Sequence, residues 1–172
     1  MKVLGWALFT GGVAGMIVLS IVCSLSVYQF NRGCADYLKL AGDASTIEAA
    51  NGFLGQALAY METTGKTSGN SSLIFKKPLS DVGIWYKQTK DAKGVLEGII
   101  AKGDEATGTE KSNALLKVRE TVLDGTSVTY PPHIALYPGG SYAVAVILWW
   151  VLGLATVGGV IFLAIGYWEY IS

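Results

Sequence analysis

Two long stretches without a charged residue, one near each end of the chain, restrict the possible folds more than any other feature. They cover residues 3–31 and 134–168, which is 29 and 35 residues. A helix needs about 20 apolar residues to cross the hydrocarbon core of a bilayer. A secretory signal peptide has an apolar region of only about 7 to 15 residues. The sequence therefore predicts an integral, multi-pass membrane protein whose first span is an uncleaved signal anchor.

Charged residues lie almost entirely between these stretches. The middle segment holds 12 of the 13 basic and 12 of the 13 acidic residues, so it is neutral and gives no reason to expect nucleic acid. About 100 residues suffice for one small core. We predict a first transmembrane helix in residues 1–31, a soluble helical-bundle domain in residues 32–132, and a linker with the second transmembrane helix in residues 133–172.

Aromatic residues mark the expected ends of both spans, as is typical of side chains at the level of the lipid headgroups. The predicted interface anchors are Trp6, Tyr28, Tyr142, Tyr167 and Trp168. Trp149 and Trp150 fall inside the second span, where placement at an interface does not explain them. We expect these two residues to pack on the first span or on a neighbouring protein.

Small residues are dense in both spans, and in lipid they allow helix backbones to approach closely. The predicted helix–helix packing residues are Gly11, Gly15, Gly153, Ala155, Gly158 and Gly159. Two readings stay open: the spans pack on each other, or they mediate self-association or a larger complex. Neither span contains Asp, Glu, Lys, Arg or His in its apolar core, whereas transporters and ion channels usually do.

The middle segment shows helical periodicity with start and stop residues. The first span is expected to continue as a helix to about Gly42, and three amphipathic helices follow, with residues 126–138 as an extended link. The predicted caps are Ser45 with Glu48, Ser80, and Thr107 with Glu110, and the predicted stops are Gly65, Gly103 and Gly125. No strand is expected between these helices. Together they predict an all-α membrane protein in which two transmembrane helices bracket an up-down antiparallel four-helix bundle.

Residues that carry chemistry are few and scattered. Lys66 follows a glycine as in a phosphate-binding loop, but Tyr60 stands where that loop requires another glycine. His133 has no neighbouring zinc ligands in the sequence. Cys23 and Cys34 lie eleven residues apart, too far along a helix for a disulfide, and Cys34 is expected to be half-buried near the membrane surface. We therefore predict no enzyme, and no catalytic, cofactor-binding or metal-binding residues.

The order of elements resembles the membrane-bracketed helical sensor domains of bacterial receptors, although only a few residues follow the second span. The favoured function is a non-enzymatic accessory or scaffold subunit of a membrane protein complex, and the alternative is a membrane-anchored small-ligand sensor. The predicted partner contacts are Tyr86, Lys87, Lys90, Trp149 and Trp150. Because long soluble segments cross regardless of charge, we expect an extracytoplasmic middle domain at a plasma or inner membrane.

Overall fold

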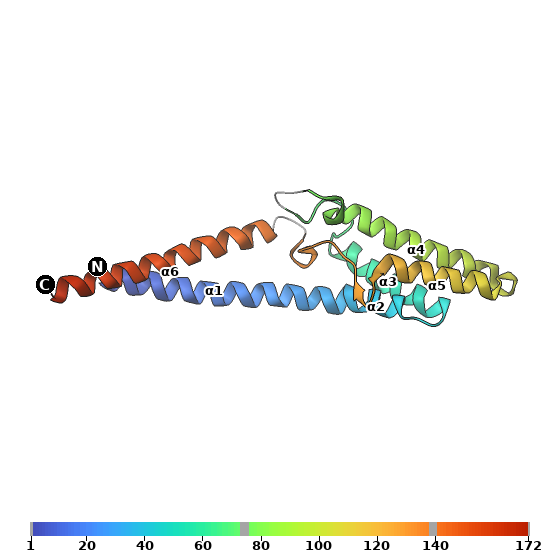
Figure 1. Ribbon diagram of the computed structural model, residues 1–172, viewed down its shortest axis with the longest axis horizontal. Coiled ribbons are helices and arrows are strands. Elements are labelled where there is room, and N and C mark those ends of the chain that lie inside the picture. The colour runs from blue at the N-terminus through green and yellow to red at the C-terminus, as the bar shows by residue number, and fades with distance from the viewer. Residues whose placement is uncertain (1, 73–75, 138–140, 172) are drawn as a thin grey trace. The chain divides into compact units, whose positions relative to one another are not determined.

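The computed structural model describes residues 2–72, 76–137 and 141–171, apart from the side chains of residues 141 and 169–171. Residue 138, the end of the predicted link, lies outside this description. The chain is mostly helical (Figure 1) and divides into two compact units. The helix pair comprises residues 1–26 and 140–172, and the middle unit comprises residues 27–139. These boundaries differ from the predicted ones because apolar residues at the inner ends of both uncharged stretches belong to the middle unit.

The helix pair consists of α6 (Ser141–Ile171) and of α1 (Lys2–Phe30) except its last four residues, which belong to the middle unit. Both helices are long and apolar enough to cross a membrane, and only 6% of the most apolar window of each is buried. A core helix of a water-soluble protein would hide most of such a surface. The prediction of two long apolar helices near the ends of the chain is therefore confirmed.

Within the middle unit, α1 passes through a π-helical turn, η1 (Asn31–Ala35), into α2 (Asp36–Gly42). Three longer helices follow: α3 (Ile47–Thr63), α4 (Val82–Lys102) and α5 (Gly108–Val122). Short 3-10 turns lie at η2 (Pro78–Ser80), η3 (Gly103–Glu105) and η4 (Ile134–Leu136). Helix α2 packs against α3 and α5, and α4 packs against the same two helices.

The helix starts follow the predicted capping chemistry with two corrections. Thr46, and not Ser45, caps α3, and its hydroxyl oxygen accepts a hydrogen bond from the Ala49 amide. Asp81, and not Ser80, caps α4. In both cases two capping residues are adjacent, and the second one has the extended backbone that an N-cap requires. The capping box of Thr107 and Glu110 at the start of α5 is confirmed.

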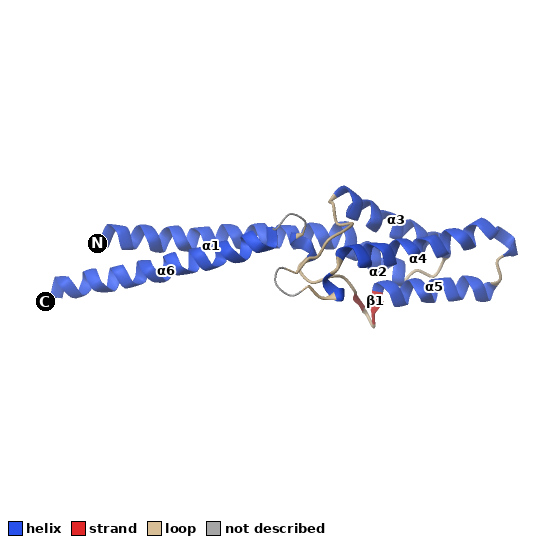
Figure 2. Ribbon diagram, turned by 90° about the horizontal axis from the view of Figure 1, so that it is seen from above, coloured by secondary structure: helices blue, strands red, loops and turns tan. Residues whose placement is uncertain are grey.

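A short hairpin follows α5 and so lies after the helices between which no strand was predicted. It joins β1 (Leu123–Asp124) and β2 (Ser127–Val128), shown in red in Figure 2. Gly125 occupies the turn with a φ of 64°, a conformation that glycine adopts without steric cost. The residue predicted to stop α5 therefore turns the chain between two strands.

The core of the middle unit contains apolar residues from every long helix. Leu38, Leu54, Leu96 and Val118 come from α2, α3, α4 and α5 and are fully buried. Cys34 is also fully buried in this core, which corrects the expectation of a half-buried position. Phe30 and Ile134 belong to the two uncharged stretches, yet they too lie in this core.

Candidate functional site

A cluster of aromatic rings lies at the end of the middle unit where the chain arrives from α1. Phe30, the last residue of α1, is only 1% exposed. Its ring centroid lies 5.1 Å from that of Tyr130, 6.3 Å from that of Tyr60 and 6.5 Å from that of Trp85. These separations are typical of edge-to-face and tilted aromatic contacts. The cluster therefore joins α1, α3, α4 and the segment after β2 at one end of the unit.

An open groove of about 610 Å³ borders this cluster. Its walls come from η2, the first two turns of α4 and the segment that follows β2. The lining residues are 77–81, 84, 85, 88, 124 and 129–132. Trp85 contributes to both the cluster and the groove, and its indole N–H donates to the Thr129 carbonyl at 3.0 Å. This bond connects the two walls and satisfies the one polar atom of the indole.

Three apolar side chains of the groove are exposed, and together we call them the apolar rim. Leu79 is 80% exposed, Ile84 is 47% exposed and Tyr130 is 41% exposed. Leu79 is held in η2, where the Ser80 and Asp81 amides donate to the Lys77 and Pro78 carbonyls. The exposed position of Leu79 is therefore imposed by a hydrogen-bonded turn.

Charged groups flank the apolar rim unequally. Lys76 and Lys77 are both exposed just before η2. The Asp81 carboxylate accepts a hydrogen bond from the Ile84 amide at 2.9 Å, so it is engaged in capping α4. Asp124 lines the opposite wall and is exposed. The chain beside Leu79 thus presents two lysine ammonium groups, and the carboxylate of Asp81 caps the N-terminus of α4.

A buried lysine secures the same end of the middle unit. Lys66 is only 4% exposed, and its ammonium donates to the Tyr137 carbonyl, while the Tyr137 hydroxyl donates to the Ser68 carbonyl at 2.5 Å. Burial lowers the pKa of Lys66, and the nearby Cys34 opposes this effect. Burial also raises the pKa of the Cys34 thiol to about 12. The predicted loop after α3 is therefore joined by two hydrogen bonds to Tyr137, in the segment that leads towards α6.

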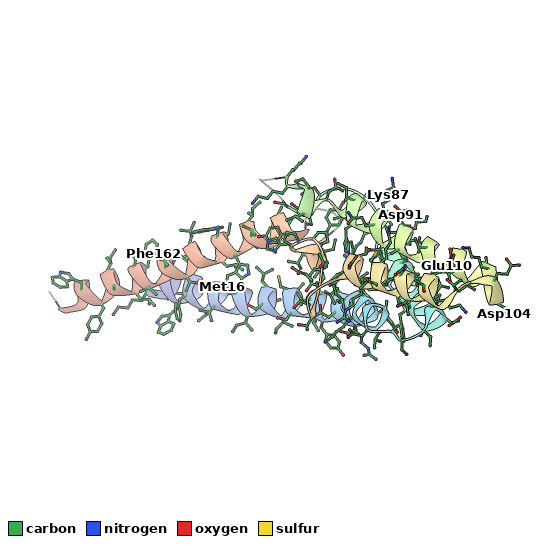
Figure 3. All side chains as sticks on the ribbon, turned by 45° about the vertical axis from the view of Figure 1, so that its right-hand side comes forward. Met16, Lys87, Asp91, Asp104, Glu110 and Phe162 are labelled. Atoms are coloured by element: carbon green, nitrogen blue, oxygen red, sulfur yellow. The ribbon has the colours of Figure 1, made fainter. Side chains whose placement is uncertain are left out.

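Two of the three predicted partner contacts on α4, Tyr86 and Lys90, interact with other residues of this chain. The Tyr86 hydroxyl donates to the Glu62 carboxylate at 2.6 Å, and the pKa of Tyr86 is raised chiefly by this hydrogen bond. The Lys90 ammonium lies 5.7 Å from the centre of the Tyr86 ring. Lys87 is exposed on α4, near Asp91 (Figure 3). Of these three residues, Lys87 and Lys90 are exposed, and Tyr86 is half-buried.

The two apolar helices approach each other through some of the predicted small residues. A Cβ atom at Gly159 would lie 2.6 Å from the Phe9 amide nitrogen and 2.8 Å from the Gly5 carbonyl. One at Gly12 would lie 3.0 Å from the Leu152 carbonyl, and one at Gly15 would meet the Leu152 side chain. Met16 and Phe162 mark these two helices in Figure 3. The contact surface between α1 and α6, which we call the seam, therefore requires glycine at positions where the two backbones approach very closely.

Three other predicted packing residues, all glycines, face away from this seam. Within the described part of the chain, a Cβ atom at Gly11, Gly153 or Gly158 would meet nothing within 4 Å. Ala155 is half-buried. The contact on α1 thus runs through Gly12 in place of its neighbour Gly11, because the position of α6 selects one face of the helix.

Most aromatic residues of the helix pair point outwards. The predicted anchors Trp6, Tyr28, Tyr167 and Trp168 are exposed, and Tyr142 is half-buried. Trp150 is 72% exposed and Trp149 is 44% exposed, so the expected packing of Trp150 on the first span is not found.

Sequence reasoning missed the apolar groove and its rim. A local indication exists in residues 76–80, where a leucine stands in an otherwise polar, proline-containing turn.

Comparison with known proteins gives no relative: no family model, no curated protein and no solved structure matches this chain.

Proposed function

We propose that this protein is a non-enzymatic accessory or scaffold subunit of a membrane protein complex. In this proposal α1 and α6 cross the bilayer of a plasma or inner membrane, and the middle unit is an extracytoplasmic up-down four-helix bundle. The span-length apolar surfaces of both helices support the membrane assignment. The pairing of α2 and α4 with both α3 and α5 supports the bundle.

The exposure of Trp150 is the observation that carries the proposal of a protein partner. Trp150 lies nine residues after the start of α6, about 14 Å along the helix. Tryptophan is typical of the membrane interfaces, where its indole N–H has polar partners. At 72% exposure on an uncharged span, this indole is covered by a neighbouring protein in our proposal.

Gly153 provides the space that such a partner needs. It lies three residues after Trp150, and side chains at that spacing share one face of a helix. A Cβ atom at Gly153 would meet nothing within 4 Å among the described residues. A large aromatic side chain beside a glycine forms a surface into which a second helix can pack closely.

The test uses the full chain extracted from its native membrane in mild detergent. We expect native mass measurement to show the protein together with a second polypeptide or a second copy. Trp150→Ala is expected to abolish this assembly. The control is Val151→Ala, because Val151 lies at the same depth and is 55% exposed but points about 100° away around the helix. A strictly monomeric particle for the unaltered protein would contradict the proposal.

A small-ligand sensor remains the second candidate because the groove has a suitable size. Its volume of about 610 Å³ falls within the range of small-molecule sites. A ligand in the groove would stabilise the middle unit against heat. Thermal unfolding of the full chain in detergent with a panel of metabolites tests this candidate, and the absence of any shift across the panel counts against it.

A further inference from the structure

We propose that the apolar rim, Leu79, Ile84 and Tyr130, together with Lys76 and Lys77, binds the headgroup layer of an anionic bilayer. The rim would enter the same bilayer that α1 and α6 cross, so this inference rests on the membrane assignment proposed above. Its occupant is a lipid surface, with apolar side chains below the phosphates and lysine ammonium groups beside them.

The grouping of apolar side chains is the first observation that supports a lipid surface. Single exposed hydrophobic residues are ordinary on a protein surface. Leu79, Ile84 and Tyr130 are instead brought into one groove from chain segments about 50 residues apart. Leu79 is also the most exposed large apolar side chain in the described part of the middle unit. A grouped apolar surface of this kind marks an interaction site.

The position of the groove within the middle unit selects the bilayer as the occupant. Two of its residues, Trp85 and Tyr130, contact the ring of Phe30, with which α1 ends. Pro132, at the other wall, precedes the start of α6 by nine residues, which span at most about 30 Å even when extended. The groove is therefore built on the chain segments that lead into both apolar helices.

The chemistry of the rim fits a headgroup layer that contains anionic lipid. Lys76 and Lys77 are exposed beside Leu79, and lysine buries its aliphatic stem while its ammonium binds phosphate. Tyr130 has an apolar ring with a polar tip, as is typical of residues at the membrane interface. The carboxylate of Asp81 accepts a hydrogen bond from the Ile84 amide at the positive N-terminal end of α4, which offsets part of its negative charge beside an anionic surface.

The experiment measures the depth of a spin label in the full chain reconstituted into nanodiscs. Leu79→Cys is introduced together with Cys23→Ser, and the buried Cys34 is left in place. Two further labels provide references: Glu105→Cys in η3 at the far end of α4, and Val18→Cys in α1. Accessibility to oxygen reports a lipid environment, and accessibility to a water-soluble nickel complex reports water.

We expect the label at position 79 to show an oxygen-to-nickel ratio several-fold above that at position 105 in nanodiscs of phosphatidylcholine with phosphatidylglycerol. The ratio is expected to fall in phosphatidylcholine alone. Lys76→Gln with Lys77→Gln is expected to reduce the equilibrium constant for the lipid-bound state of the rim by about fivefold per lysine in anionic nanodiscs. Because Leu79 is 80% exposed, its replacement leaves the core intact, and circular dichroism checks the helical content.

Each other outcome has a distinct meaning. Equal ratios at positions 79 and 105, with position 18 in lipid, would overturn the lipid-binding rim while leaving the spans intact. Shielding of position 79 from both reagents would assign the rim to a protein contact and would equally overturn the inference. A water-accessible label at position 18 would instead contradict the membrane assignment of the proposed function.

Discussion

The close approach of α1 and α6 at Gly159 leads to a sharp prediction, because its neighbour Gly158 provides a matched control. In Gly159→Ala the new methyl group would lie 2.6 Å from the Phe9 amide nitrogen, which is 0.8 Å short of an ordinary contact at 3.4 Å. That nitrogen belongs to the backbone, so it cannot rotate away, and the helices must separate. At Gly158 a Cβ atom would meet nothing within 4 Å among the described residues.

The magnitude follows from the loss of packing along the seam. A gap of about 0.5–1 Å removes roughly a quarter to a half of the dispersion energy of each contact. Overpacking of this kind costs about 1–3 kcal/mol, or roughly a 5- to 150-fold change in an equilibrium constant. Replacing glycine by alanine in a helix also gains about 0.5–1 kcal/mol, but this gain is common to both variants. The difference between them therefore isolates the contact between helices.

The assay measures separation of the two helices in mixed micelles. Donor and acceptor fluorophores on the first turn of α1 and the last turn of α6 report their distance as denaturing detergent is added. We expect Gly159→Ala to separate at lower detergent than the unaltered protein, and Gly158→Ala to separate at equal or higher detergent. Equal destabilisation by both variants would refute the assignment of the seam to the face that contains Gly159.

Three further predictions concern the middle unit. Phe30→Ala is expected to lower the unfolding free energy by about 3–5 kcal/mol, because this buried ring packs on three others. The control Leu116→Ala, on the exposed face of α5, should change it by no more than about 0.5 kcal/mol. Urea unfolding measures both variants, and similar losses would argue against the aromatic cluster. The hydrogen bonds of Glu110 to Lys102 and Thr107 lower its pKa from 4.5 to about 2. A carboxyl group whose pKa is lowered on folding stabilises the fold above pH 4.5, and this stabilisation is lost as the pH falls towards 2. Glu110→Gln should therefore make the unfolding free energy depend less on pH in this range. The exposed control Glu105→Gln should leave that dependence unchanged. The Cys34 thiol is buried and has a pKa of about 12. In a Cys23→Ser variant it should therefore react with a water-soluble thiol reagent only when the protein unfolds. Rapid labelling of the native protein would contradict the place of Cys34 in the core.

Much of the helical organisation was accessible from the sequence because it is encoded locally. The apolar stripe of α3 recurs at three- and four-residue steps, and its members from Ile47 to Met61 are buried as predicted. The capping box at Thr107 was found because both partners lie within one turn of the chain. Where two capping residues are adjacent, as at Ser45 and Thr46, local pattern does not distinguish between them.

Features that depend on distant segments were not accessible in the same way. Phe30 and Ile134 are apolar residues in uncharged stretches, and composition alone does not separate a side chain that faces lipid from one in a protein core. The choice of Gly12 over Gly11 depends on where α6 lies around α1. The groove combines η2, α4 and the segment after β2, so no single window of sequence contains its pattern.

The most direct test of this account is the location of three epitopes on intact and permeabilised cells. One epitope is placed at each end of the chain and one in the exposed turn at Gly125 between β1 and β2. We predict that the turn is accessible on intact cells and that both terminal epitopes become accessible only after permeabilisation. If the terminal epitopes lie on opposite sides of the membrane, or if either shares a side with the turn, then α1 and α6 do not both cross the bilayer and the account is wrong.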